Sequence, residues 1–129
     1  MTNDPPEEQR RLARRRLAWR FGRRGEALCA WRLRLEGYRI LARDVRTHVG
    51  EIDLIAQRGR LLAFIEVKAR TATTDEPVTA RQRRRIVRAA ESFLAAHPGL
   101  AGLDARFDVM LVGGGMIPRH IKAAFRADD

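Results

Sequence analysis

Cysteine, aromatic residues and long apolar runs are all scarce in this chain. Cys29 is the single cysteine, so no disulfide can form within the chain, and this fits the reducing cytoplasm, where we expect the protein to reside. No stretch approaches 18 consecutive apolar residues and no apolar segment follows the first charges, which argues against a spanning helix and a secretory signal. Trp19 and Trp31 lack the pattern of a surface that stacks bases.

Acidic residues are outnumbered, with 16 Asp and Glu against 26 Lys and Arg, which gives a formal charge of +10. The excess is mostly arginine and gathers in two windows, residues 10–24 and 81–88. Such patches favour polyanions, nucleic acid first. We expect residues 1–22 to form a basic arm, for which a disordered tail is an open alternative, and residues 126–129 to be frayed.

The remaining 23–125 are expected to form one domain, since 129 residues of which 45% are hydrophobic can bury a core. Cys29 falls on the apolar stripe of a helix, which indicates a core residue rather than a nucleophile. The three histidines have no spacing typical of a zinc site, and we expect all of them at the surface: His48, His97 and His120.

Hydrophobic periodicity predicts two helices. The first covers about 24–36 and ends at Gly37, a common C-terminal stop. The second covers about 80–97, and Thr79 with Gln82 three positions later predicts a capping box at its start.

Strand-like segments precede and follow the second predicted helix in the sequence. Three strands over 38–46, 51–57 and 61–69 are separated by short turns, which predicts an antiparallel meander. After the polar stretch 70–77 and the second helix comes a strand over 106–112, and an edge strand over 117–125 follows. The order strand, helix, strand favours a right-handed crossover and a parallel pair within a mixed sheet.

Acidic groups and a lysine interrupt two otherwise apolar strands, at GEIDLI (50–55) and FIEVK (64–68). Side chains alternate between the faces of a strand, so Glu51 should share a side with Asp53, and Glu66 with Lys68. The apolar neighbours should point the other way: Ile52, Leu54, Ile65 and Val67. If the hairpin register allows it, Asp53, Glu66 and Lys68 converge on one spot.

Carboxylates beside an apolar sheet are costly to bury unless they are paired. A hard divalent cation would pair with them, because Mg²⁺ takes one or two carboxylates together with waters and phosphate oxygens. Lys68 could then orient the attacking water or neutralise charge in the transition state. The alternative is an ion pair of Lys68 with Glu51 or Glu66 on a solvated sheet face.

Two further carboxylates allow two interpretations each. Glu26 lies in the first turn of the first predicted helix, where it complements the helix dipole or turns toward the strand cluster. Asp108 alternates with Phe107 and Val109 and so faces away from their core side. It either binds a loop or backbone amide or has a functional role.

The two strand motifs, the Val78-Thr79 that opens an arginine-rich helix, and RFDV at 106–109 together resemble the YraN family of uncharacterised bacterial proteins. The resemblance covers about 23–125, with FIEVK extended to FIEVKAR through Arg70. It implies an α/β fold of the restriction-endonuclease-like superfamily, a mixed sheet flanked by helices with an α-β-β-β-α-β core. The signature of that superfamily is Asp, a variable gap and Glu-x-Lys, and the family is similar to archaeal Holliday-junction resolvases.

By position, the resemblance makes Asp53 and Glu66 metal ligands and Lys68 the catalytic lysine. Glu26 matches an acidic residue that many relatives carry on the first helix, as a further ligand. Two departures concern Asp44, where relatives often have asparagine, and Gln82, where many have lysine, so that a phosphate contact would pass to neighbouring arginines. The expected nucleic-acid contacts are Arg46, Arg81, Gln82, Arg84 and Arg85, with Glu51 in a secondary role.

These residues predict an endonuclease-like protein that uses Mg²⁺ or Mn²⁺ to act on DNA, and the resolvase resemblance points to branched or recombination intermediates. Two alternatives stay open. One is a nucleic-acid-binding module with the same fold and no chemistry. The other is a basic protein bound to RNA or the ribosome, and a homodimer is open in each case.

Overall fold

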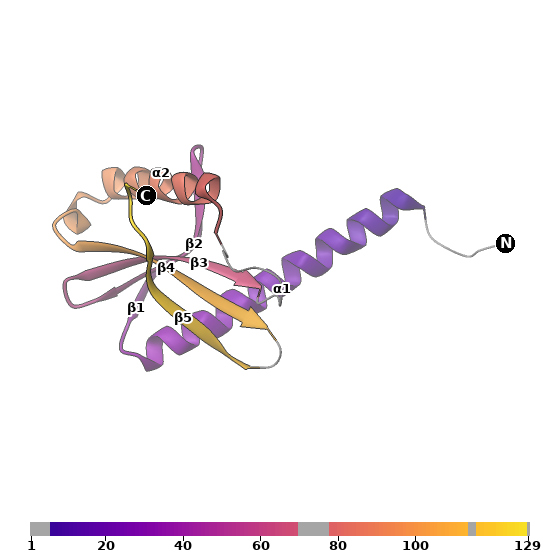
Figure 1. Cartoon of the computed structure of the whole chain (residues 1–129), viewed down its shortest axis with the longest axis horizontal. Helices are drawn as coiled ribbons and strands as arrows, with labels where there is room; N and C mark the ends of the chain where they lie inside the picture. The colour runs from indigo at the N-terminus through magenta and orange to yellow at the C-terminus, as the bar shows by residue number, and fades with distance from the viewer. Residues whose placement is uncertain (1–5, 70–77, 114–115, 129) are drawn as a thin grey trace.

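The computed structural model describes residues 6–69, 78–113 and 116–128, with the side chains of 11–24 and 116 left aside (Figure 1). Its elements are α1 (Glu7–Leu35), β1 (Arg39–Thr47), β2 (Gly50–Arg58), β3 (Leu61–Ala69), α2 (Ala80–Ala96), a 3₁₀ turn (Pro98–Leu100), β4 (Asp104–Gly113) and β5 (Met116–Phe125). No helix in these ranges is long and apolar enough to cross a membrane. The polar stretch 70–77 and Arg70 of the family motif lie outside them.

The five strands form one mixed sheet in the order β1-β2-β3-β4-β5. β1, β2 and β3 are antiparallel neighbours, β3 and β4 are parallel, and β5 returns antiparallel at the edge. The predicted meander, parallel pair and edge strand are therefore confirmed. A parallel pair requires a long crossover, and α2 lies within it.

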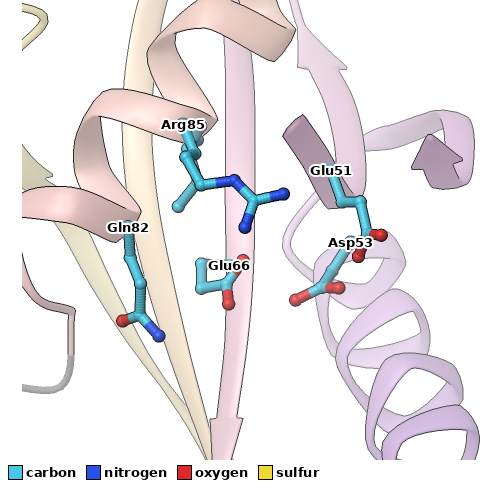
Figure 2. A pocket seen from close by; sticks show the side chains of 6 residues that line it. Glu51, Asp53, Glu66, Gln82 and Arg85 are labelled. Carbon is cyan, nitrogen blue, oxygen red and sulfur yellow. The ribbon is translucent and has the colours of Figure 1, made fainter. Parts of the chain in front are cut away.

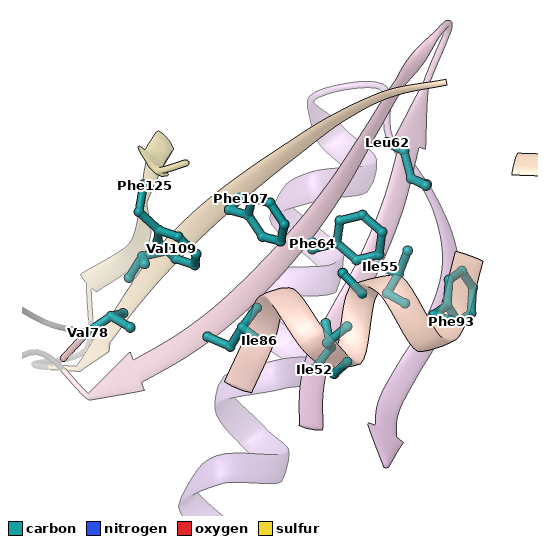
Figure 3. Close-up of a cluster of buried hydrophobic side chains, with 12 residues drawn as sticks. Ile52, Ile55, Leu62, Phe64, Val78, Ile86, Phe93, Phe107, Val109 and Phe125 are labelled. Carbon is teal, nitrogen blue, oxygen red and sulfur yellow. The ribbon is translucent and has the colours of Figure 1, made fainter. Parts of the chain in front are cut away.

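α1 and α2 cover opposite faces of the sheet, so each face has a core (Figure 1). On the α2 side, Phe64 and Phe107 stack with ring centroids 5.6 Å apart, and Phe93 meets Phe64 edge to face (Figure 3). On the α1 side, Leu33 and Cys29 are fully buried. Cys29 is thus a core residue, as expected, and burial, together with the charges of Asp53 and Glu26, raises its pKa to about 12.

The expected alternation along β2 is wrong at one point. Ile52 packs on the α2 side and Leu54 on the α1 side, although the sequence pattern places them together. Ile52 and Ile55, three positions apart, share a face, so the alternation is interrupted between them. In the β1 ladder the interruption lies opposite Asp44, which has a left-handed backbone with φ of 49°. Asp and Asn tolerate this conformation better than most residues.

α1 begins at Glu7, far ahead of the predicted start near Arg24. The added turns are rich in arginine, alanine and leucine, which are good helix formers, but they lack the apolar stripe on which the prediction depended. Figure 1 shows this part of α1 extending beyond the sheet. The end is as expected, because Gly37 adopts a φ of 91° just after the helix. The division between an arm and a domain at residues 22 and 23 stays a prediction.

Candidate functional site

Asp53 lies where β2 separates from β3. The two strands pair from Arg58 opposite Leu61 up to Leu54 opposite Ile65. Beyond that point, the backbone N–H of Val67 donates to Oδ2 of Asp53 at 2.7 Å. The side chain of Asp53 therefore takes the place of a ladder carbonyl, and this bond fixes the carboxylate at the splayed end of the strand pair.

Glu66 and Lys68 stand on β3 next to this point. Nζ of Lys68 is 3.6 Å from Oε1 of Glu66, and the Glu66 carboxyl group hydrogen-bonds to that of Asp53. Both side chains are mostly buried, with 26% of Lys68 and 18% of Glu66 exposed. The structure thus brings together Asp53, Glu66 and Lys68, the three residues of the sequence motif.

The protonation of the two carboxyl groups is linked. Burial and the neighbouring charge of Asp53 raise the pKa of Glu66 to about 8, against the opposing effect of Lys68. Burial also raises the pKa of Asp53, although the Val67 N–H favours its ionised form. Two ionised carboxylates have no hydrogen to share, so a bond between them requires one proton, which the pair holds in common.

These carboxyl groups open into a cavity of about 220 Å³ between the strands and α2. Figure 2 shows the guanidinium of Arg85 directed into the space between Glu66 and the side chains of Glu51 and Asp53. Gln82 and Ile86 of α2 complete the lining. The cavity therefore combines acidic groups on the sheet with a cation on the helix above them.

The chemistry of the donor set fits a hard divalent cation. Two carboxylates that share a proton at neutral pH gain from exchanging it for a cation, and Mg²⁺ needs only one or two carboxylates besides waters and phosphate oxygens. Asp53 and Glu66 would hold it. Among the described residues no group of three or more His, Cys, Asp and Glu side chains is arranged as a metal-ligand set.

Glu26 is therefore not part of such a group. It lies half-buried on α1, which covers the opposite face of the sheet from α2. After burial, its charge and that of Asp53 both raise the pKa of the Cys29 thiol. Its role as a further ligand stays a prediction.

The residues expected to contact nucleic acid divide among several places. Arg85 lines the acidic cavity, and Arg81 and Arg84 line a second cavity beside it. Gln82 forms the predicted capping box: its Oε1 accepts the N–H of Thr79 at 3.1 Å and its N–H donates to Oγ1 of Thr79 at 3.2 Å. Arg46 is exposed on β1, where its Nε lies 3.4 Å from Oδ1 of Asp44.

A buried charge network lies on the other face of the sheet, and the sequence did not reveal it. Asp108 is fully buried and accepts bonds from Arg106 at 2.7 and 2.6 Å, from Nε2 of His120 at 2.7 Å and from the N–H of Ala123 at 3.0 Å. The other ring nitrogen of His120 is 3.1 Å from Glu36. Arg106 also donates to the hydroxyl of Tyr38 at 2.7 Å.

This network has a structural role, because it ties β5 to β4 and to the end of α1. Asp108 binds a backbone amide, one of the two predicted alternatives. The expected surface position of His120 is wrong, since its side chain is 2% exposed, whereas His48 and His97 are exposed. Nothing in the sequence around a histidine of an edge strand indicates that it will be buried between two carboxylates.

A mixed five-stranded sheet with helices on both faces defines an α/β protein whose fold is consistent with a restriction-endonuclease-like core. A family model described as uncharacterised protein family UPF0102 matches residues 25–112. UPF0102 proteins of Bradyrhizobium diazoefficiens and Paramagnetospirillum magneticum are 49% and 46% identical to the chain. The first alignment covers 85% of this chain and 84% of the relative, and the second 99% and 100%. The chain belongs to the UPF0102 (YraN) family.

Proposed function

We propose that this protein is a phosphodiesterase that uses Mg²⁺ or Mn²⁺ to cleave DNA, acting as an endonuclease on branched or recombination intermediates in the cytoplasm. One observation carries the proposal. Asp53 and Glu66 lie together at the mouth of a cavity that an arginine enters from the opposite side. Acids on one wall and a cation on the other suit a phosphodiester bound together with a divalent metal ion.

Each residue then has a task. Asp53 and Glu66 would hold the metal ion, which supplies Lewis acidity toward the phosphate and lowers the pKa of a bound water. Lys68, 3.6 Å from Glu66, positions the attacking water or neutralises charge that develops on the phosphate. Arg85 binds a phosphate oxygen from the helix side. Glu26 and Glu51 contribute negative charge around the metal site without direct contact with the reacting phosphate.

The arginines of α2 bind the nucleic-acid backbone. Such contacts give affinity and position the strand without reading its sequence, because phosphates are the same in every sequence. Arg81, Arg84 and Arg85 are exposed on α2 and carry this role, and Arg46 extends it onto β1. The Oε1 of Gln82 is used in the helix cap, so its amide NH₂ group is the part that can contact the strand.

The test is a cleavage assay on linear, flapped and four-way DNA, with Mg²⁺, with Mn²⁺ and with EDTA. The proposal requires cutting that depends on the metal and disappears in Asp53→Ala. A structured RNA in the same assay tests the RNA alternative. Metal-independent binding to all substrates with no cutting of any would overturn the proposal.

One observation favours a binding module without chemistry as the second candidate. Without a metal, Lys68 and the N–H of Val67 already give the carboxyl groups of Glu66 and Asp53 partners. This protein would then bind nucleic acid through α2 alone. The two candidates differ in one property, since only the first makes Asp53 necessary for a reaction.

A further inference from the structure

A second cavity of about 360 Å³ lies beside the acidic one and is lined by basic residues. His48 and Val49 of the turn between β1 and β2 form one wall. The other wall is α2, with side chains at positions i, i+3, i+4 and i+7 on one helical face, which are Arg81, Arg84, Arg85 and Arg88. None of the described residues that line it is acidic.

Arg85 points toward the carboxyl groups of the acidic cavity, but the positive charge of the other three arginines has no partner within the described ranges. None of the four guanidinium groups forms a hydrogen bond or an ion pair there. Like charges four positions apart destabilise a helix, and the first turns of α2 are its positive dipole end. That turn contains no acidic residue to compensate. An anion in the cavity would relieve this repulsion.

The turn that forms the other wall is held directly against α2. A Cβ atom on Gly50 would lie 2.3 Å from the backbone oxygen of Arg85, so only glycine permits this approach. Oγ1 of Thr47 accepts the N–H groups of Val49 and Gly50 at 3.2 and 3.1 Å and donates to the Gly50 oxygen at 2.8 Å. The cavity is therefore shaped by backbone contact before any ligand arrives.

We infer that this arginine cavity binds a phosphate group of a nucleic-acid strand, the one beside the phosphate that occupies the acidic cavity. Arg85 lines both cavities, so the two sites are adjacent. The strand then crosses the first turns of α2, and the extra phosphate contact lies on one side of the reacting bond only. The position of the reacting bond rests on the proposed function, whereas phosphate binding in the arginine cavity does not.

The first measurement is binding of fluorescent single-stranded and duplex DNA by anisotropy in EDTA, where nothing is cut. Arg84→Ala/Arg88→Ala should weaken binding at least tenfold and lower the slope of log affinity against log salt by about 1.8 for duplex, two contacts at about 0.9 each. The control, Arg39→Ala/Arg119→Ala, removes two exposed arginines away from both cavities. Equal losses in the two variants would overturn the inference.

The melting temperature of the protein without DNA provides a second measurement. Because the arginines repel one another, Arg84→Ala/Arg88→Ala should melt at a higher temperature than the wild type without DNA, and the control should not. Arg84→Lys/Arg88→Lys keeps the charge and should retain most of the affinity. An unchanged or lower melting temperature of the alanine variant would show that the cluster is a solvated helix face and contradict the inference.

Modified DNA distinguishes an internal phosphodiester from a terminal phosphate as the group that is bound. If an internal phosphodiester is bound, a single neutral methylphosphonate linkage should weaken binding to the wild type several-fold and leave binding to Arg84→Ala/Arg88→Ala unchanged. If a terminal phosphate is bound, replacing a 5′- or 3′-phosphate by hydroxyl should do the same. Losses that persist fully in the variant would overturn the site. Binding that behaves as expected without metal-dependent cutting would keep this inference and reject the proposed reaction.

Discussion

The carboxylate of Asp53 accepts the backbone N–H of Val67 at 2.7 Å, at the point where β2 leaves β3. A buried backbone N–H needs a partner, so the departing strand requires an acceptor at this position. The same carboxyl group hydrogen-bonds to Glu66 and lines the cavity. Asp53 is therefore held by the sheet itself rather than by flexible neighbours.

Replacing Asp53 tests the reaction. Asp53→Ala should reduce metal-dependent cleavage at least a hundredfold, equivalent to about 2.7 kcal/mol, because the group lost acts on the transition state. DNA affinity in EDTA should stay within a few fold, since the arginines of α2 are intact. Glu51→Gln, an exposed residue of the same cavity, is the matched control and should lose much less. Cleavage at the wild-type rate in Asp53→Ala would reject the site.

The raised pKa of Glu66 predicts how metal-free stability depends on pH. Below its ordinary pKa of 4.5 the group is protonated in both the folded and the unfolded protein, so it does not make the free energy of unfolding depend on pH there. Between pH 4.5 and about 8 the unfolded chain releases this proton while the folded protein keeps it, so the free energy of unfolding falls as pH rises. Glu66→Gln should flatten this window in denaturant titrations at several pH values. A variant with the same pH dependence as the wild type would contradict the shared proton.

Divalent ions should stabilise the wild type. Because the ion binds only the folded site, it adds about 2.7 kcal/mol at a hundred times its dissociation constant. It must displace the proton of Glu66, so the rise in melting temperature with millimolar Mn²⁺ or Mg²⁺ should be larger at pH 8 than at pH 6. Glu66→Gln should raise metal-free stability and abolish the response. An unresponsive wild type with a destabilised Glu66→Gln would identify a structural ion pair instead, once uncleavable DNA has been added to complete the site.

Much of this architecture follows from local pattern. Alternation and short turns give the meander, and the capping box of Thr79 and Gln82 places the start of α2. These signals lie within a few residues of each other, so no knowledge of packing is needed. The proximity of Asp53 and Glu66 follows as well, because a hairpin sets its own register.

The features that the sequence did not predict depend on contacts between distant residues or on an interruption of a regular strand. Alternation along β2 fails between Ile52 and Ile55, opposite the left-handed Asp44 of the neighbouring strand, and no local pattern predicts this. The buried position of His120 requires Glu36, 84 residues away, to meet it. Glu26 stands on a helix whose placement against the sheet no local pattern specifies, so its distance from Asp53 could not be predicted.

Gly50 sets the separation between the strand and α2. Gly50→Ala would place Cβ 2.3 Å from the backbone oxygen of Arg85, so the helix or the strand must shift. We expect a loss of about 1–3 kcal/mol in the free energy of unfolding, as for other overpacked sites. Gly99→Ala is the control, since nothing lies within 4 Å of its added Cβ. Denaturant unfolding of both variants checks this, and equal stabilities would show that the contact yields easily.

The His120 network should matter for stability and not for the reaction. Both ring nitrogens of His120 face carboxylates and its side chain is 2% exposed, so His120→Gln disturbs its buried bond to Asp108 and its partly buried one to Glu36. We expect the free energy of unfolding to fall by about 3 kcal/mol. His48→Gln, at an exposed position, should change it by less than about 0.5 kcal/mol. Burial opposes ionisation of Asp108, but its bonds to His120, Arg106 and Ala123 outweigh burial and lower its pKa.

That lowered pKa means that the ionised Asp108 stabilises the fold above its ordinary value of 3.8 and that this contribution is lost as the pH falls below it. The fall in the free energy of unfolding at low pH should therefore be smaller in His120→Gln, because this variant lacks the histidine bond that helps to lower the pKa of Asp108. Because the network lies on the α1 face, away from the acidic cavity, folded His120→Gln should cleave at nearly the wild-type rate and keep its metal response. Unfolding at pH 3 to 7 and a cleavage assay well below the melting temperature measure both. Loss of cleavage with unchanged stability would instead assign His120 to the reaction and place the active centre on the opposite face of the sheet from Asp53.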